Sequence, residues 1–534
     1  MSGLTRSLGL RSLTLAVVSG TIGSGWLFAP FYAARSAGAA SLIAWLLGGI
    51  LAFGLAMVFA ELGALVPSSG ALAQIPMLSH GRLAGFIGGW CAWLAYLALP
   101  AIEVLAMIQY LASDLPWLTL DGGQGQVLSP WGLGCAAVLL VLMTWVNLAG
   151  VQTLARWIDT LTGWKLVVPL LISAALMLSA ADWSNLLVPI GPPAQGERWL
   201  PGVVQAISSG GILFSLLGFR TAMDLAGEAR DPQRTVPLAM GLGLGLSIAI
   251  YLVLQLAFLL AVPHGNLNAG WGALQLGAHG GPLAAIALGL GLSWVVGLLL
   301  SDAVISPGAT AMTYLGLSGR VAWMMGSLRL LPRRLEHLNR QAVPSTALLL
   351  SLGIGIGMLL LGPSWQQVVS FLTACLVIAL AIGPVSLLAL RQQLPHARRA
   401  YALPWASVLC PLTFVAASWA VIWCGRTALE GAIPLVLLPA LCFAWWKQRR
   451  GQGLDAAHGR WWFGYLMGLL LISELSGPER LIPGGVLTQA LLVSGFALAI
   501  FDVAVRARLQ HPSKEAQVSI HELRMTTPPQ KSKG

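Results

Sequence analysis

The segment Gly20-Thr21-Ile22-Gly23-Ser24-Gly25 interrupts the first long apolar run of the chain with three glycines, a serine and a threonine. Glycine is costly inside a regular helix, so this run predicts a helix that breaks partway along its length. In a lipid bilayer, an interrupted backbone is tolerated only where it is buried in protein or lines a cavity. The segment therefore predicts a binding site, provided that it crosses a membrane.

The composition of the whole chain favours that location. Of 534 residues, 57% are hydrophobic and 9% are charged, whereas a soluble domain carries about 25% charged residues. In a soluble protein the net charge of +11 would suggest nucleic acid. Here the basic residues lie in short loops between apolar segments, which is the pattern that orients a membrane protein. We therefore expect an integral membrane protein in contact with lipid, and no nucleic-acid partner.

Apolar runs of about 20 residues, the length that crosses a bilayer, recur along the chain. Fourteen spans are predicted, at residues 12–32, 39–63, 86–111, 131–150, 159–180, 203–228, 237–262, 283–315, 345–361, 366–390, 404–423, 432–446, 461–475 and 485–505. The thirteenth is short, and whether it crosses fully is left open.

The charges of the loops orient these spans. Of the 30 lysines and arginines, only four fall in loops on the predicted outer side: Arg35, Arg198, Arg426 and Arg480. Lys165 and Arg220 fall within spans, and the rest lie on the other side. This bias predicts that the protein lies in a bacterial-type inner membrane with both termini on the cytoplasmic side. The polar tail, residues 506–534, is predicted to be disordered there.

A second interruption lies in the sixth predicted span. Ser208-Ser209-Gly210-Gly211 is followed by the segment 214–220 (FSLLGFR), and we expect the helix to break near Gly218. Five spans begin with each broken helix, and matching breaks in two halves indicate an inverted-repeat transporter with its site at the bilayer midplane. The free N–H groups at a half-helix N-terminus suit a carboxylate. For either cluster alone, glycines that merely allow helices to pack closely are the alternative.

Three stretches of the chain resemble a known family, the amino acid–polyamine–organocation (APC) superfamily of permeases. Residues 20–30 (GTIGSGWLFAP) resemble its glycine-rich first-helix signature. Residues 59–62 (FAEL) with 66–70 (VPSSG) are similar to the end of its second helix and the following loop. Residues 214–219 (FSLLGF) with 226–237 (AGEARDPQRTVP) resemble its sixth-helix signature and loop.

The resemblance implies an all-α membrane protein with a core of two inverted repeats of five helices, in which helices 1 and 6 are broken. The repeats would cover residues 12–180 and 203–391, with about four accessory helices in 404–505 and a cytoplasmic N-terminus in 1–11. Many relatives have twelve spans rather than fourteen, and many carry an acidic residue where this chain has Arg220. The most similar subgroup is the bacterial fourteen-span aspartate–proton symporter type.

The resemblance also implies where an amino acid would bind. The first break would receive its carboxylate, at Thr21, Ile22, Gly23, Ser24 and Gly25. The second break would receive its amino group through freed carbonyls, at Phe214, Ser215 and Gly218.

Three ionisable residues inside predicted spans are candidates for proton coupling, because a charge within a bilayer is costly and needs a reason. Lys165 matches the position of a fifth-helix lysine that carries the proton in proton-coupled relatives; a lysine that snorkels to the interface is the alternative. Glu103 lies deep in the third span and Asp302 in the eighth. For both, a structural hydrogen bond between helices is the alternative.

Arg220 has two interpretations. Its guanidinium could bind a second carboxylate on the substrate through two parallel hydrogen bonds. Alternatively, Arg220, Asp224 and Glu228 are spaced by four and could pair on one helix face.

Together these patterns predict a secondary active amino acid transporter that is not an enzyme and is coupled to protons, and the first interpretation of Arg220 favours acidic amino acids. An exchanger of amino acids or polyamines without proton coupling is the alternative. No HExxH motif or CxxC pair occurs, so no metal or cofactor is expected. The substrate, the stoichiometry and the oligomeric state are not determined by the sequence.

Overall fold

The structure, a computed structural model, describes residues 8–68, 70–121, 126–149, 151–191, 199–276, 281–341, 343–397, 399–451, 453–476, 482 and 485–513, without the side chains of 151–160. The greater part of the predicted disordered tail, 514–534, and of the predicted N-terminal segment, 1–7, lies outside the described residues.

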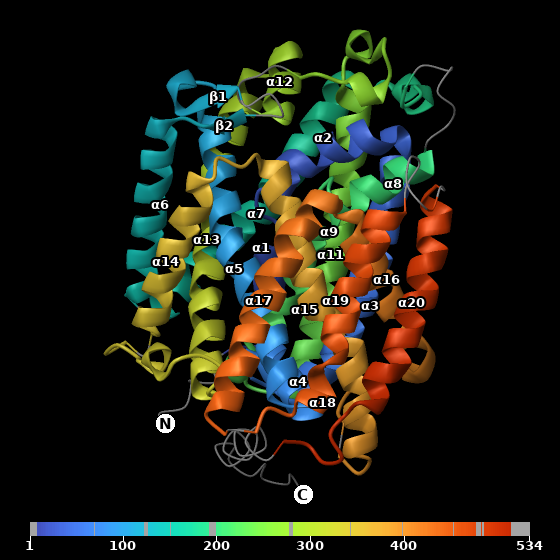
Figure 1. Ribbon diagram of the computed structural model, residues 1–534. Coiled ribbons are helices and arrows are strands. Elements are labelled where there is room, and N and C mark those ends of the chain that lie inside the picture. Colours follow the sequence, from blue (N-terminus) through green and yellow to red (C-terminus); the bar gives the residue numbers. More distant parts are fainter. Residues whose placement is uncertain are drawn as a thin grey trace, which may run out of the picture.

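The chain folds into a bundle of helices (Figure 1). The longer helices are α1 (Leu10–Thr21), α2 (Gly25–Ala37), α3 (Ser41–Leu65), α4 (Ala71–His80), α5 (Arg82–Leu111), α6 (Pro130–Leu148), α7 (Val151–Ala180), α8 (Trp199–Ser208), α11 (Pro232–Ala261), α12 (Pro282–Gly289), α13 (Ser293–Ser327), α14 (Ser345–Leu360), α15 (Trp365–Gln393), α16 (Ala406–Trp423), α17 (Arg426–Arg449), α19 (Trp461–Leu475) and α20 (Val486–Arg506).

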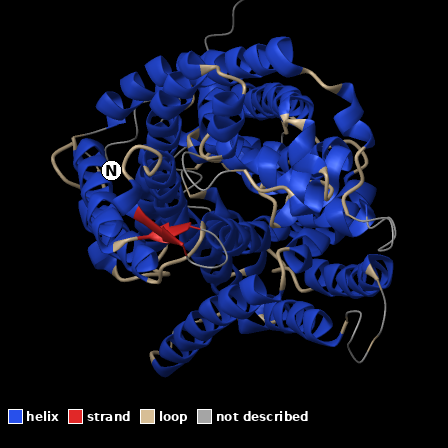
Figure 2. Cartoon of the chain, turned by 90° about the horizontal axis from the view of Figure 1, so that it is seen from above, coloured by secondary structure: helices blue, strands red, loops and turns tan. Residues whose placement is uncertain are grey.

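Short helices and turns connect them. These are α9 (Ile212–Leu216), α10 (Thr221–Asp224), α18 (Ala456–Gly459), and the 3-10 turns η1 (Gly38–Ala40), η2 (Pro116–Leu118), η3 (Trp183–Leu187), η5 (Leu217–Arg220), η6 (Ala226–Glu228), η7 (His264–Leu267), η8 (Trp271–Ala273) and η9 (Arg333–Glu336). The strands β1 (Thr119–Asp121) and β2 (Gln126–Leu128) pair antiparallel, with Leu120 opposite Val127. In the view along the bundle, the two short strands of this hairpin are surrounded by helices (Figure 2).

Each of the fourteen predicted spans overlaps a helix or an interrupted set of helices. Within the described residues, ten helices are long and apolar enough to cross a bilayer, or eleven if the bent segment from α8 to η6 counts as one span. Three predicted spans are not counted separately: the first is split into α1 and α2, with α2 counted together with α3, while α14 has 16 residues and α19 has 15. The all-α membrane class is therefore confirmed, while the assignment of residues 12–180 and 203–391 to two inverted repeats stays a prediction.

The outer surface of the bundle is suited to lipid. On α3, Ile43, Leu46, Leu47 and Ile50 share one face and are 44–69% exposed. In water such a stripe would be a large apolar patch, but in a bilayer it is the surface that faces the hydrocarbon. Nearly every residue of α5 and α15 is buried, so these two helices form the centre of the core.

The first predicted break is confirmed. Helix α1 ends at Thr21 and α2 begins at Gly25, and Ile22 between them leaves the helical conformation with φ −92° and ψ 88°. The second predicted break is also confirmed: α9 ends at Leu216, and the 3-10 turn η5 replaces the α-helix around Gly218. A sharper change of direction precedes it, because the chain bends by 46° between α8 and α9, at residues 209–211. Gly211 makes that bend possible because its φ of +92° favours a residue without a side chain.

Three further features differ from the predictions. The eighth span was predicted as one helix over 283–315, but Gly291, with φ +72°, separates α12 from α13, and α13 runs on to Ser327. Helix α4, between the second and third spans, was not predicted because its ten residues are too few to cross a bilayer. The β1–β2 hairpin was also missed, because its strands have three residues each.

The two ends of the described chain lie at the same end of the bundle. Leu8 pairs with the segment after η6, donating its N–H to the Glu228 carbonyl at 3.0 Å. Ser513 donates its N–H to the Leu78 carbonyl of α4 at 3.2 Å. The last turns of α13 join these regions, because Arg320 pairs with Glu228 at 2.9 Å and Met324 packs on Gly70 just before α4. Figure 1 shows α4 and α18 at this end.

The positive-inside bias predicts that this end faces the cytoplasm. A reporter protein fused after Gly534 should therefore show cytoplasmic activity, whereas the same reporter fused after Ser129, beyond three predicted spans, should show periplasmic activity. Paired alkaline phosphatase and β-galactosidase fusions measure both. Phosphatase activity of the Gly534 fusion would contradict the predicted orientation.

Candidate functional site

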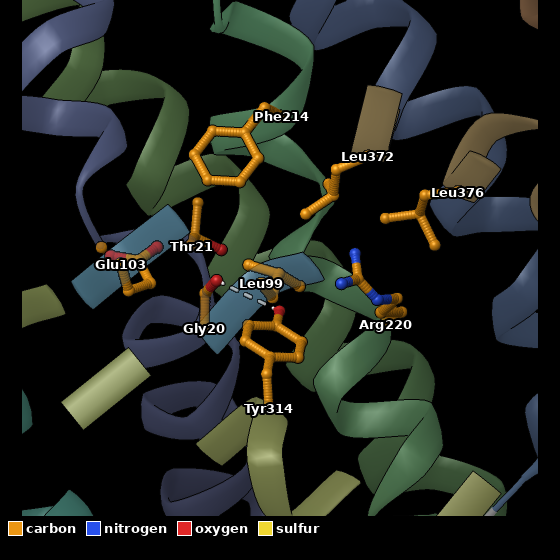
Figure 3. A pocket seen from close by; sticks show the side chains of 10 residues that line it. Gly20, Thr21, Leu99, Glu103, Phe214, Arg220, Tyr314, Leu372 and Leu376 are labelled. Atoms are coloured by element: carbon orange, nitrogen blue, oxygen red, sulfur yellow. Dashed lines mark hydrogen bonds between the residues drawn. The ribbon is translucent and has the colours of Figure 1, made fainter. Parts of the chain in front are cut away.

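A small cavity lies where the two broken helices meet (Figure 3). Its lining residues are Gly20, Thr21, Gly23, Leu99, Glu103, Phe214, Arg220, Tyr314, Leu372 and Leu376. The centre of a water-sized sphere can occupy about 10 Å³ of this cavity. The cavity therefore holds about one water molecule. Five of the predicted site residues therefore line one cavity, but an amino acid fits only after its apolar walls move apart.

The two breaks touch backbone to backbone. A Cβ atom on Gly218 would stand 2.5 Å from the backbone nitrogen of Thr21 and from the carbonyl carbon of Gly20. Real Cβ atoms do not approach backbone so closely, so only glycine fits at position 218. Gly218 thus joins the two interrupted helices even though the second bend lies at Gly211.

The N-terminus of α2, which the break leaves without a preceding helical turn, is capped by a carboxylate. Ser24 donates its backbone N–H to Oε2 of Glu103 at 2.6 Å. Glu103 is fully buried, and its second oxygen, Oε1, has no hydrogen-bond partner within the described residues. A Cβ on Gly23 would lie 2.5 Å from Oε1. The N-terminus of α2, where the resemblance implies that a substrate carboxylate binds, therefore holds a carboxylate of the chain itself.

The freed carbonyls at the end of α1 also have partners, and these come from three other helices. Lys165 of α7 donates from Nζ to the Ser19 carbonyl at 2.8 Å and to Oγ1 of Thr310 at 2.6 Å. Tyr314 of α13 donates to the Gly20 carbonyl at 3.2 Å, and Tyr251 of α11 donates to the Thr21 carbonyl at 2.9 Å. Lys165 is fully buried and lies against α1, so a lysine that snorkels to the interface is excluded.

Asp302 holds two tryptophans. Its Oδ2 accepts from the indole of Trp26 at 2.9 Å, and its Oδ1 accepts from the indole of Trp164 at 2.7 Å and from Ser306 at 2.6 Å. It does not line the cavity. The structure therefore places Asp302 behind the break, where it ties α2 to α7 and α13.

Arg220 lies at the far side of the cavity from Glu103, with Gly20 and Thr21 between them in Figure 3. Its guanidinium lies between the rings of Tyr96 and Tyr314, 4.7 and 4.8 Å from their centroids. Nε donates to the Tyr96 hydroxyl at 3.0 Å and Nη1 to the Leu217 carbonyl at 2.7 Å.

The alternative in which Arg220 pairs directly with Asp224 and Glu228 is wrong. Asp224 accepts a hydrogen bond from Tyr96, which separates it from Arg220, and Glu228 pairs with Arg320. The reason is local: residues 217–228 form two 3-10 turns around one short helix, so positions four apart do not share a helix face.

The remaining predicted residues pack around the breaks. Thr21 turns its hydroxyl back to the Val17 carbonyl, Ile22 is fully buried, and Ser215 donates to the Gly211 carbonyl. The Phe214 ring lies 6.0 Å from that of Trp365, edge to face. Because Thr221 and Arg220 already hold the carbonyls of Gly218 and Leu217, these two carbonyls are not free to receive an amino group in this conformation.

The sequence analysis missed several site residues, namely Tyr96, Tyr251, Thr310, Tyr314 and Trp365. Trp365 donates its indole N–H to the Ser24 hydroxyl at 3.2 Å. The available signal was weak: a hydroxyl inside an apolar span must find a partner, yet tyrosine and tryptophan are also common at membrane interfaces.

Comparisons of the sequence with known proteins find a family model and several similar transporters. The family model described as amino acid permease matches residues 8–437. The chain is 30% identical over 488 residues to the glutamate/serine transporter AimA of Bacillus subtilis, covering 90% of this chain and 89% of that protein. It is 31% identical over 476 residues to the aspartate-proton symporter of Bacillus subtilis, covering 88% and 90%. It is 24% identical over 365 residues to the lysine-specific permease LysP of Escherichia coli, covering 65% and 69%.

Leucine at position 23 or 25 should abolish amino acid uptake while leaving membrane insertion intact. A side chain at Gly23 would collide with Glu103, and one at Gly25 would collide with the Ser215 hydroxyl. Gly134→Leu is the matched control, because a Cβ there meets open space. Uptake into proteoliposomes, corrected for the amount of reconstituted protein, measures the effect. Normal uptake by Gly23→Leu or Gly25→Leu would contradict the assigned site.

Proposed function

The chain belongs to the amino acid permease family, and from this premise we propose that it is a secondary active transporter that carries an acidic amino acid together with protons by alternating access. As a multi-pass member of this family with bacterial relatives, it is a protein of the inner membrane. The named relatives are transporters and permeases, which supports transport rather than catalysis. The single observation that carries the proposal is the cavity at the two helix breaks, with a carboxylate-binding helix end on one side and Arg220 on the other.

Arg220 supports an acidic substrate. A zwitterionic backbone needs only the two helix breaks, which leaves the substrate side chain to be matched by the rest of the cavity. The guanidinium of Arg220 is buried and lines the cavity, and the hydrogen bonds that it donates within the described residues come from Nε and Nη1. It can therefore donate to a second carboxylate, whereas a cationic side chain would meet a like charge in a medium of low dielectric.

The names of the relatives point the same way. The two relatives at 30% and 31% identity are named for glutamate and serine and for aspartate and protons. The lysine-specific relative is only 24% identical and covers 65% of this chain. The likeness thus supports an acidic or small substrate over a basic one.

Lys165 supports proton coupling. Its ammonium group joins the Ser19 carbonyl at the end of α1 to Thr310 of α13. A neutral amine keeps fewer donors and no charge, so loss of the proton weakens the link between the broken helix and α13. We propose that this link is made and broken once in each transport cycle.

Uptake into proteoliposomes across a panel of radiolabelled amino acids, with and without an imposed proton gradient, tests the proposed function. Aspartate or glutamate should accumulate above equilibrium only when the gradient is inward. Uptake that requires unlabelled amino acid inside the proteoliposomes and does not depend on the proton gradient would favour the exchanger instead. Preference for neutral or basic amino acids would contradict the acidic substrate.

Lys165→Ala should lose accumulation driven by the proton gradient, because the variant removes the group proposed to carry the proton. Exchange of labelled for unlabelled substrate should persist. Lys447→Ala is the control, since Lys447 is the other lysine within the described residues and is also buried, but lies at the far end of α17. Unchanged gradient-driven uptake by Lys165→Ala would make Lys165 a structural residue.

Arg220→Gln should lower uptake of aspartate about tenfold or more relative to serine, which is the order expected for one charge-assisted pair. Glutamine keeps a polar, hydrogen-bonding side chain but removes the charge. Arg35→Gln, at the exposed end of α2, is the control. Competition of unlabelled aspartate and serine against one labelled substrate measures the ratio. Equal loss of both would show that Arg220 holds Tyr96 and Tyr314 in place rather than binding substrate.

A further inference from the structure

The carboxylate of Glu103 occupies a place that a substrate would need. It comes from α5, one of the two helices at the centre of the core. From there it reaches the N-terminus of the 13-residue helix α2. There Oε2 accepts the Ser24 N–H at 2.6 Å. A helix N-terminus with free N–H groups is where the carboxylate of an amino acid binds most favourably, through hydrogen bonds and the helix dipole.

The geometry leaves no room for a second carboxylate beside Glu103. Oε1 of Glu103 lies so close to Gly23 that a single added carbon would stand 2.5 Å from it. The open part of the cavity, about 10 Å³, holds about one water. Two carboxylates at this helix end would also repel each other strongly, because like charges at close range in a buried site cannot both stay ionised.

The second oxygen of Glu103 shows that this carboxylate is poorly satisfied where it lies. Oε1 is buried and has no hydrogen-bond partner within the described residues, although a carboxylate can accept several. An unpartnered buried oxygen is costly. Within the described residues, one hydrogen bond from the Ser24 N–H thus holds this carboxylate, and its other oxygen has none.

We infer that Glu103 is a tethered stand-in for the substrate carboxylate, which the substrate displaces when it binds. This inference rests on the proposed function. The substrate carboxylate takes over the Ser24 N–H, and Glu103 accepts one proton as it leaves, so the negative charge at the helix end is unchanged. The protonated carboxyl then has an O–H group that can donate a hydrogen bond to the substrate. Binding of one amino acid is in this way tied to uptake of one proton at Glu103, a step distinct from the later breaking of the Lys165 link proposed above.

Other titratable groups around Glu103 bind different parts of the break. They are Lys165 on α7, Tyr251 on α11, Tyr314 and Asp302 on α13, and Arg220 in η5. Lys165, Tyr251 and Tyr314 donate to carbonyls at the end of α1, and Asp302 holds Trp26 and Trp164. Within the described residues, Glu103 is the one group among these that accepts a backbone N–H at the start of α2, and Lys165 acts on it through its charge.

The test measures binding of L-aspartate, L-glutamate and L-serine to the purified full-length protein in nanodiscs between pH 5 and pH 9. For the wild type, affinity should fall by about tenfold per pH unit once Glu103 is ionised in the free protein, as expected for linkage to one proton. A pH indicator in weak buffer should report one proton taken up per amino acid bound.

Glu103→Gln should bind amino acid with little dependence on pH and with no proton uptake, because the amide stays neutral. At pH 9 it should bind at least tenfold more tightly than the wild type. Glu103→Asp keeps the charge but is shorter by one methylene, so its pH dependence should remain while its affinity at pH 9 rises. Asp502→Asn, an exposed carboxylate on α20, is the control and should behave as the wild type.

Three outcomes would overturn the inference while leaving transport intact. One is a wild type that binds amino acid without taking up a proton. Another is a Glu103→Gln variant with the pH dependence of the wild type. The third is loss of binding in both Glu103→Gln and Glu103→Asp, with an unchanged melting temperature and elution volume, because Glu103 would then be a direct ligand of the substrate. If the wild type bound none of the three amino acids and took up none, the proposed function itself would fail.

Discussion

The backbone at the break between α1 and α2 must be satisfied without water, and this requirement arranges the polar groups of the membrane core. Hydrocarbon offers no hydrogen bonds, so each free N–H or C=O needs a partner from the protein. The carbonyls at the end of α1 find Lys165, Tyr251, Thr310 and Tyr314 on α7, α11 and α13. The N-terminus of α2 finds Glu103 on α5. One interrupted helix thus determines where four other helices place polar side chains, and the same groups are those that a substrate and a proton would meet.

Asp302 extends this arrangement beyond the cavity. By accepting from Trp26 of α2 and Trp164 of α7, it ties the start of the second half-helix to the residue next to Lys165. A displacement of α2 therefore changes the surroundings of the lysine without direct contact between them. A buried charge of this kind is tolerated because its hydrogen bonds offset part of the cost of burial. Since the remaining cost is high, such a residue in a membrane-spanning helix indicates a structural or functional role. Its three hydrogen bonds favour a positioning role for Asp302 over proton carriage.

The sequence predicted what depends on local composition and could not predict what depends on packing. Long apolar runs located the helices, and the glycines of 20–25 located the first break, because glycine is costly in a helix wherever the helix lies. The interruption near Gly218 was predicted and is a 3-10 turn, whereas the 46° bend before it depends on the positive φ of Gly211, which the sequence alone does not indicate. Glu103 was recognised as an unusual buried acid, but nothing in its neighbourhood of α5 indicates a partner 79 residues away. The stacking of Arg220 between Tyr96 and Tyr314 likewise joins three separate segments, so a pairing along one helix was the nearest alternative.

The end of the bundle that holds both described chain ends is closed by contacts of two kinds. Glu61, fully buried, accepts from Arg391 at 2.6 and 3.0 Å, from the Leu403 N–H at 2.7 Å, and lies 3.0 Å from Arg399. A carboxylate removed from so many donors would be left buried and unpaired, so this cluster is costly to open. Glu228, after the second broken helix, has Arg320 of α13 as its ion-pair partner, and both side chains are largely buried, at 7% and 14% exposed. In the proposed alternating-access cycle, opening of this end would move the segment after η5 away from α5 and α13. That movement must break the Glu228–Arg320 pair and the Tyr96–Asp224 hydrogen bond, and the latter bond also fixes the ring against which Arg220 lies. The state of the cavity and the closure of this end are therefore coupled through Tyr96.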